Sequence, residues 1–178
     1  MATITVGSPA VSQTSGFDTT QYLLLKYGAA NADGTITSIE VYPYAAISGL
    51  IVGIFFLVSG IIYQCRSVVS IGSVAAGAKR TFSVSLAVKA GDFLGCQYSG
   101  GSIAQVSGSN TTFYASSGNF TVGGQTSWQF GSGATLSLQG IGSDVTSYIK
   151  TINGLVRASV KSHNGLLIAS VKSIDGLA

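Results

Sequence analysis

The C-terminal part of the sequence carries its most regular pattern. From Ile149 to Ala178 the chain reads as three units with a period of eleven residues: IKTINGLVRAS, VKSHNGLLIAS and the shorter VKSIDGLA. Each unit has a glycine at the same place, preceded by Asn or Asp. An internal repeat restricts the choice of fold more than any single residue does, because each unit must form the same local structure.

Two local structures compete for this repeat. An eleven-residue apolar period can wind into a right-handed helical supercoil. A glycine in every unit opposes this, because each costs a helix about 1 kcal/mol, and Val, Ile and Thr favour strands. Asn-Gly and Asp-Gly are strong signals for two-residue hairpin turns. We therefore predict short strands joined by turns at Asn153-Gly154, Asn164-Gly165 and Asp175-Gly176.

A two-residue turn also fixes which residues lie opposite each other. The predicted pairs are Thr151 with Val156, Ile152 with Leu155, Ser162 with Leu167 and His163 with Leu166. Alternation then gives one small apolar face, made of Val156, Ala158, Val160, Leu167, Ala169 and Val171. So short a strip cannot bury this face alone. Its partner is the chain's own sheet, another copy or another protein, and we favour an assembly element.

The composition is typical of a β-rich protein with little surface charge. Of 178 residues, 46% are apolar and only 8% are charged, with 24 glycines and two prolines. The formal net charge of +3 lies on residues 149–178, which contain no aromatic residue. Binding of single-stranded nucleic acid usually needs a denser basic patch with stacking aromatics, so we expect no nucleic-acid partner.

Short apolar segments separated by Gly, Ser and Asn follow one another from residue 22 to residue 139. This spacing predicts an all-β fold, an antiparallel, jelly-roll-like β-sandwich with a C-terminal β-repeat tail. We assign residues 1–16 to an N-terminal arm, 17–143 to the sandwich and 144–178 to the tail. The nearly uncharged run 46–62 approaches the length of a membrane span. Gly and Ser interrupt it, so we predict a buried strand over 50–58, a turn at Ser59-Gly60 and no membrane contact.

Chemistry-bearing residues are few and scattered. The only histidine, His163, occupies a repeat position that holds Ile in the other units, and Cys65 and Cys96 lie in apolar runs typical of core residues. We therefore predict no enzyme, catalytic residue, cofactor or metal site. Sequence alone does not decide whether the two cysteines pair. Trp128 and Tyr114 are candidates for a glycan-binding platform, with core packing as the alternative.

One block of the chain resembles a known kind of module. Its marks are GTITSIEV from Gly34, IGSVAAGAKRTF from Ile71, VKAGDFLG from Val88 and a following glycine pair. It resembles β-sandwich modules of uncharacterised phage and environmental bacterial proteins. The K-x-I-N-G-L units of the tail are similar to repeats at the ends of such virion-associated proteins. The resemblance implies a structural or adhesive virion component, often a trimer.

We accordingly expect a non-enzymatic virion protein, such as a fibre, spike, tail-associated or decoration subunit. Its expected partners are copies of itself, other virion or surface proteins, and glycans. No secretory signal is recognisable at the start, which favours a protein made in the host cytoplasm and carried in the virion. Two alternatives remain: an extracellular filament or surface-layer subunit that polymerises by strand exchange, and a carbohydrate-binding adhesion module.

Overall fold

The computed structural model describes residues 2–18, 21–108, 112–115, 117–130 and 133–144, and the strand residues 151–152, 155–156, 162–163 and 166–167. All described elements are β-strands, and the hydrogen-bonded strand pairs are antiparallel. The predicted all-β class is therefore confirmed. The chain divides into two compact units, Met1–Asp144 and Val145–Ala178.

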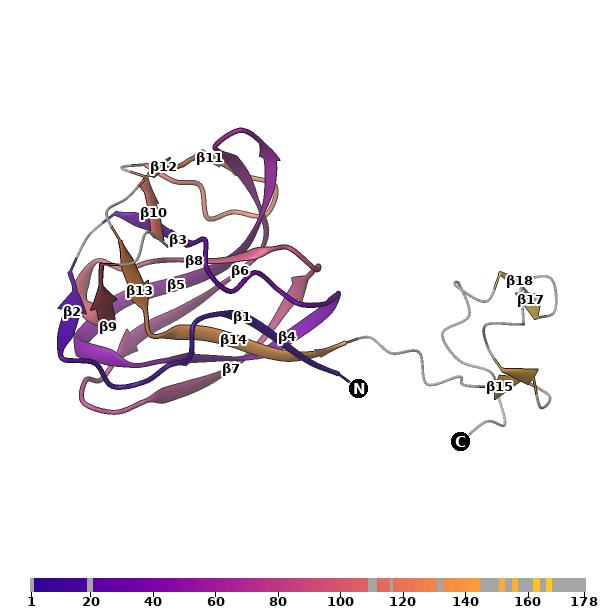
Figure 1. Cartoon of the computed structure of the whole chain (residues 1–178), viewed down its shortest axis with the longest axis horizontal. Coiled ribbons are helices and arrows are strands. Elements are labelled where there is room, and N and C mark those ends of the chain that lie inside the picture. The colour runs from indigo at the N-terminus through magenta and orange to yellow at the C-terminus, as the bar shows by residue number, and fades with distance from the viewer. Residues whose placement is uncertain are drawn as a thin grey trace. The chain divides into compact units, whose positions relative to one another are not determined.

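The first unit contains a four-stranded sheet that joins the two ends of the unit. Its order is β1 (Thr3–Gly7), β14 (Leu138–Asp144), β4 (Gly34–Val41) and β7 (Arg80–Val88). β1 runs along β14 from the Thr3–Ser143 pair onward (Figure 1). The Ala2 amide also donates to Asp144 Oδ1 at 2.9 Å. The segment that we assigned to an N-terminal arm thus supplies a strand of the sheet.

The outer edge of β1 is covered by its own chain. The Thr5 amide donates to Asn31 Oδ1 at 3.0 Å, and Asn31 Nδ2 donates to the Thr3 carbonyl at 3.1 Å. The Gly7 amide donates to the Gly28 carbonyl at 2.7 Å. The Asn31 carboxamide therefore takes the place of a further strand, which is one way to protect a sheet edge from pairing with other chains.

The second sheet of the first unit has ten strands and curls into a half-barrel (Figure 1). Its main path is β11 (Gln125–Ser127), β6 (Ile62–Val74), β5 (Pro43–Ser59), β8 (Phe93–Gln97), β3 (Tyr22–Leu25), β10 (Thr112–Ala115) and β12 (Gln129–Phe130). β9 (Gly100–Ser107) pairs with β5, and also with β2 (Ser15–Phe17) and β13 (Ala134–Leu136). Bulges in β5 bend it, so that its first part pairs with β9 and its middle with β8.

Two hydrophobic cores lie on opposite faces of the ten-stranded sheet. The larger core receives side chains from both sheets, including Ile4, Ile36 and Leu94. The smaller core contains Leu24, Phe55, Tyr63, Cys65, Phe113, Ala115 and Trp128. Successive side chains of a strand point to opposite faces. On β3, accordingly, Leu23 and Leu25 enter the larger core and Leu24 enters the smaller one.

The same geometry explains the long apolar run. Val52 and Ile54 of β5 enter the larger core, whereas Phe55 enters the smaller. A strand that is buried on both faces needs apolar residues at consecutive positions. The predicted strand over 50–58 is confirmed within β5, which is longer than expected and extends from Pro43 to Ser59. The turn lies at Gly60 and Ile61, one residue beyond the predicted Ser59-Gly60. Over the described parts of the chain, no helix has the length and apolar character needed to cross a membrane.

The described residues of the second unit form two short hairpins. One joins β15 (Thr151–Ile152) to β16 (Leu155–Val156), and the other joins β17 (Ser162–His163) to β18 (Leu166–Leu167). Their four residue pairs are those that the Asn-Gly turns predict. The turn residues Asn153, Gly154, Asn164, Gly165, Asp175 and Gly176 lie outside the described residues. So do Ala158, Val160, Ala169 and Val171 of the predicted assembly face.

Candidate functional site

A polar groove in the first unit is the candidate binding site. It encloses about 320 Å³ and is lined by Ser117, Gly118, Asn119, Gln125, Thr126 and Ser127. β11, which supplies one wall, is an end strand of the ten-stranded sheet and pairs with β6 (Figure 1). All six lining residues are uncharged, so hydroxyl, carboxamide and backbone groups provide the polar chemistry of the groove.

Hydrogen bonds hold the two walls in place. The Asn119 amide donates to Thr126 Oγ1 at 2.8 Å, and this bond joins one wall to the other. Asn119 Oδ1 accepts from the Thr121 amide at 3.1 Å and also from the Thr121 hydroxyl. Such an Asx turn is a local preference of Asn. Beyond it, the Gly123 amide donates to the Cys65 carbonyl at 2.8 Å and so ties the wall to β6.

Two glycines allow close contacts in the groove. A Cβ atom on Gly118 would lie 2.6 Å from the Tyr22 ring, and one on Gly124 would lie 2.3 Å from the Asn119 carboxamide carbon. Real Cβ atoms essentially never approach other heavy atoms so closely. The backbone of one wall thus lies directly against Tyr22, and the Asn119 carboxamide lies against the backbone of Gly124.

A chain of aromatic contacts leads from the Tyr22 ring into the smaller core. The ring centroids are 5.4 Å apart for Tyr22–Phe120, 4.8 Å for Phe120–Phe55 and 5.7 Å for Phe55–Trp128. Trp128 is fully buried, and its Nε1 has no hydrogen-bond partner among the described residues. A ring without an exposed face cannot be a glycan platform, so that prediction is wrong for Trp128. Tyr114 lies on β10, opposite Leu23 and Gln129.

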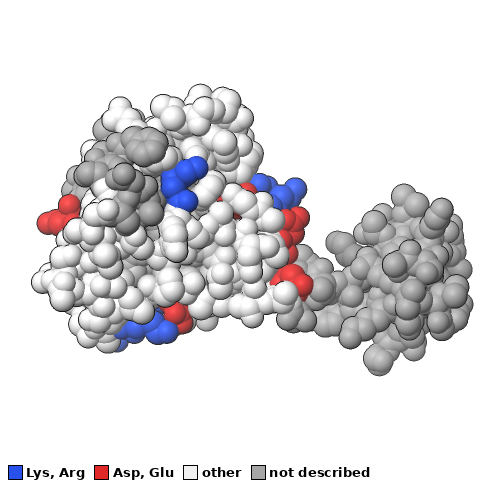
Figure 2. Space-filling view, viewed as in Figure 1, with Lys and Arg blue, Asp and Glu red and all other residues white. Residues whose placement is uncertain are grey.

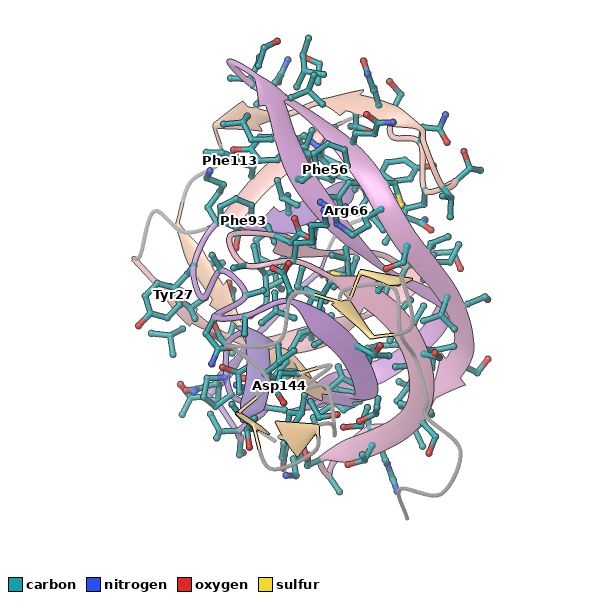
Figure 3. All side chains as sticks on the ribbon, turned by 90° about the vertical axis from the view of Figure 1, so that its right-hand side faces the viewer. Tyr27, Phe56, Arg66, Phe93, Phe113 and Asp144 are labelled. Atoms are coloured by element: carbon teal, nitrogen blue, oxygen red, sulfur yellow. The ribbon has the colours of Figure 1, made fainter. Side chains whose placement is uncertain are left out.

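A buried ion pair fixes the turn between β7 and β8. The Asp92 side chain is 3% exposed and accepts from Arg66 Nε at 2.5 Å and Nη2 at 3.1 Å. It also accepts from the Lys89 amide at 2.8 Å. The Arg66 guanidinium lies 4.5 Å from the centroid of the Phe56 ring, and both residues are labelled in Figure 3. The pair thus connects the turn to β6.

Lys26 is held among aromatic rings. Its Nζ lies 4.2 Å from the centroid of Phe93 and 5.4 Å from that of Phe113, whose rings neighbour each other in Figure 3. The ammonium also donates to the Tyr63 hydroxyl at 2.5 Å. Such cation–π contacts stabilise a lysine whose stem covers apolar surface. This arrangement accounts for Lys26 structurally.

The two cysteines are buried free thiols. Cys65 belongs to the smaller core and Cys96 to the larger, so the sheet separates them. Burial raises the pKa of the Cys65 thiol to about 11 and that of Cys96 to about 12. Their prediction as core residues is confirmed. No group of three or more His, Cys, Asp or Glu residues that could hold a metal ion occurs in the described ranges.

The β5–β6 hairpin ends in an exposed apolar tip. Leu57, Val58 and Ile61 are 50%, 46% and 50% exposed, and the hairpin lies beside β11 (Figure 1). Sequence reasoning placed Leu57 and Val58 in a buried strand, and the structure corrects this because both are about half exposed. It also missed the groove, because Ser, Gly and Asn signal loops in general and do not indicate which loops converge.

Comparisons with known proteins give no relative. The chain matches no protein-family model, no curated protein and no solved structure. The geometry and the sequence pattern therefore carry the functional argument.

Proposed function

We propose that this chain is a non-enzymatic structural subunit of a virion that assembles with copies of itself through its C-terminal repeat. A fibre, spike, tail-associated or decoration subunit fits this role. In this proposal the two sheets of the first unit form a jelly-roll-like sandwich that serves as a stable body. The repeat supplies the contacts between copies, with Val156, Ala158, Val160, Leu167, Ala169 and Val171 as the contact face.

The register of the two hairpins is the observation that carries the proposal. Both hairpins pair as the Asn-Gly turns predict, and among the described residues each is a two-stranded sheet. A two-stranded hairpin is marginally stable in water unless further strands or packing support it. In this register, alternation places the small apolar residues of the repeat on one face. Association with the same face of other copies would bury them.

The low charge of the chain supports the same role. Only 8% of the residues are charged, and on the visible face of the described residues Figure 2 shows charged side chains as a few separate groups. A first unit with few charges gives little electrostatic repulsion between bodies that pack side by side, whereas the net charge of +3 lies on residues 149–178.

Two matched variants of the full chain test this proposal. Val156→Lys with Val171→Lys places charges on the proposed contact face, whereas Ser159→Lys with Ser170→Lys adds the same charge to the opposite face. Burying an unpaired ammonium is strongly unfavourable. We expect the first variant to lower the molar mass measured by light scattering and the second to keep the mass of the unchanged protein.

The masses distinguish the candidate functions. A closed oligomer that only the first variant dissociates supports the proposal. Open-ended polymers on negatively stained grids would favour the filament or surface-layer alternative, because heterologous contacts that do not close form fibres. A monomeric full-length protein, or equal masses for both variants, would contradict assembly through the repeat.

A further inference from the structure

We propose that the groove formed by residues 117–119 and β11 binds a neutral sugar. This inference is independent of assembly through the repeat. Ser117, Asn119, Gln125 and Ser127 are exposed and line the groove together. Their hydroxyl and carboxamide groups both donate and accept hydrogen bonds, as the hydroxyl groups of a sugar require.

The lining disfavours other classes of ligand. Phosphates, sulfates and carboxylates are usually bound by Arg, Lys or helix N-termini, and none of the six lining residues is charged. An apolar or aromatic ligand needs an apolar slot, whereas five of the six lining residues carry a hydroxyl or a carboxamide and the sixth is Gly118. The volume of about 320 Å³ lies at the lower end of the range for ligand pockets. It suits one or two sugar rings.

The groove is also preformed. Thr121 holds the Asn119 carboxamide oxygen, which orients the amide and leaves Nδ2 as the donor for a ligand. The Asn119–Thr126 bond fixes the distance between the walls, and the contact of Gly118 with Tyr22 anchors one wall to the aromatic core. Polar groups that are already held in place lose little conformational entropy when a ligand binds. This favours binding of a neutral sugar, which forms no ion pairs with the protein.

Trp128 provides a reporter for this site. It is the only tryptophan of the chain and directly follows Ser127, a lining residue. The full-length protein is titrated with neutral mono- and oligosaccharides built from glucose, galactose, mannose and N-acetylglucosamine, and separately with a sialylated and a sulfated sugar. Tryptophan fluorescence and saturation-transfer NMR report binding. We expect a saturable response to at least one neutral sugar.

Three variants locate the binding. Ser117→Tyr fills the groove and should abolish the response. Gln125→Ala removes one hydrogen-bonding group and should weaken affinity about three- to tenfold. Gln139→Ala is the matched control, because it removes a glutamine from β14 in the other sheet and should leave affinity unchanged. Circular dichroism and thermal melts confirm that each variant is folded.

The outcomes separate clearly. Silence of both readouts across the neutral panel at millimolar sugar would overturn the proposal. So would a preference for the charged sugars, or binding that Ser117→Tyr leaves intact. None of these results bears on the oligomer mass, so the assembly proposal is tested separately.

Discussion

The Arg66–Asp92 pair allows the sharpest prediction for the body of the protein. Asp92→Ala removes a carboxylate that is 3% exposed and leaves Arg66, itself 22% exposed, without its partner. Breaking a buried ion pair from one side typically costs about 3–5 kcal/mol. Because the guanidinium retains some contact with solvent and stacks on Phe56, we expect a loss near the lower end, about 3 kcal/mol in the free energy of unfolding.

The second partner gives a graded series. Arg66→Lys keeps the charge but loses the two-pronged contact with the carboxylate and the stacking on Phe56, so its loss should fall between those of Arg66→Met and the unchanged protein. In a double-mutant cycle of Asp92→Ala with Arg66→Met, the two losses should not add, and the coupling should exceed about 1 kcal/mol. Urea unfolding followed by circular dichroism at one fixed protein concentration measures these values.

The exposed Lys79–Glu40 pair is the matched control. Its N–O distance is 2.9 Å, but the lysine side chain is 48% exposed, and exposed pairs contribute about 0–1 kcal/mol. Lys79→Ala should therefore lower stability by less than about 1 kcal/mol. If Asp92→Ala destabilises the protein no more than Lys79→Ala, the argument from burial is refuted.

Three further predictions concern packing and pH. Leu24→Ala, in the smaller core, should cost about 2–5 kcal/mol, whereas Leu57→Ser at the half-exposed hairpin tip should change stability by about 0.5 kcal/mol or less; urea unfolding compares them. Gly118→Ala should destabilise the groove wall, because its Cβ would meet a tyrosine ring at 2.6 Å, and a lower melting temperature with weaker protection of nearby amides from hydrogen exchange checks this. Burial raises the pKa of Cys96 from 9.0 to about 12 and that of Cys65 to about 11, so as the pH rises the thiols ionise in the unfolded chain before they ionise in the folded protein. The two thiols should therefore leave the free energy of unfolding unchanged below pH 9 and lower it above pH 9, by up to about 1.4 kcal/mol per pH unit and thiol. Cys→Ala variants should reduce this slope.

The sequence predicted where strands occur better than it predicted which faces of those strands are buried. Alternation of polar and apolar residues identifies a strand with one buried face, and the sequence of β7, RTFSVSLAV, alternates in this way. β3 and the middle of β5 lack alternation because the two cores bury both of their faces. Their continuous apolar runs indicate burial, but they do not reveal that a second, smaller core exists.

The candidate site depended on contacts that sequence reasoning cannot supply. Asp92 follows glycine in a sequence typical of a turn, where it accepts a bond from the Lys89 amide, but sequence does not show that its partner is Arg66 on β6. For Trp128 the sequence left an exposed glycan platform and core packing open, and its ring fills the smaller core. The groove arises only because β11 pairs with β6 and brings Gln125 close to Asn119.

The covered edge of β1 decides which end of the chain could be exchanged between copies. Ile4 and Val6 are fully buried. Withdrawing β1 from its sheet would expose both side chains, and the lost burial would cost about 1.5–3 kcal/mol for each. It would also break the bonds to Asn31. Donation of the N-terminal strand to a neighbour is therefore disfavoured, and the C-terminal repeat is the better candidate for contacts between copies.

Asn31→Ala tests this conclusion directly. It removes the carboxamide that bonds both the Thr5 amide and the Thr3 carbonyl, and the loss of these bonds should lower stability by about 1–2 kcal/mol. If assembly uses the repeat, the molar mass of the variant should equal that of the unchanged protein. Larger assemblies in the variant would mean that an uncovered β1 edge can pair with other copies, and strand exchange through the sheet would then replace the repeat as the basis of assembly.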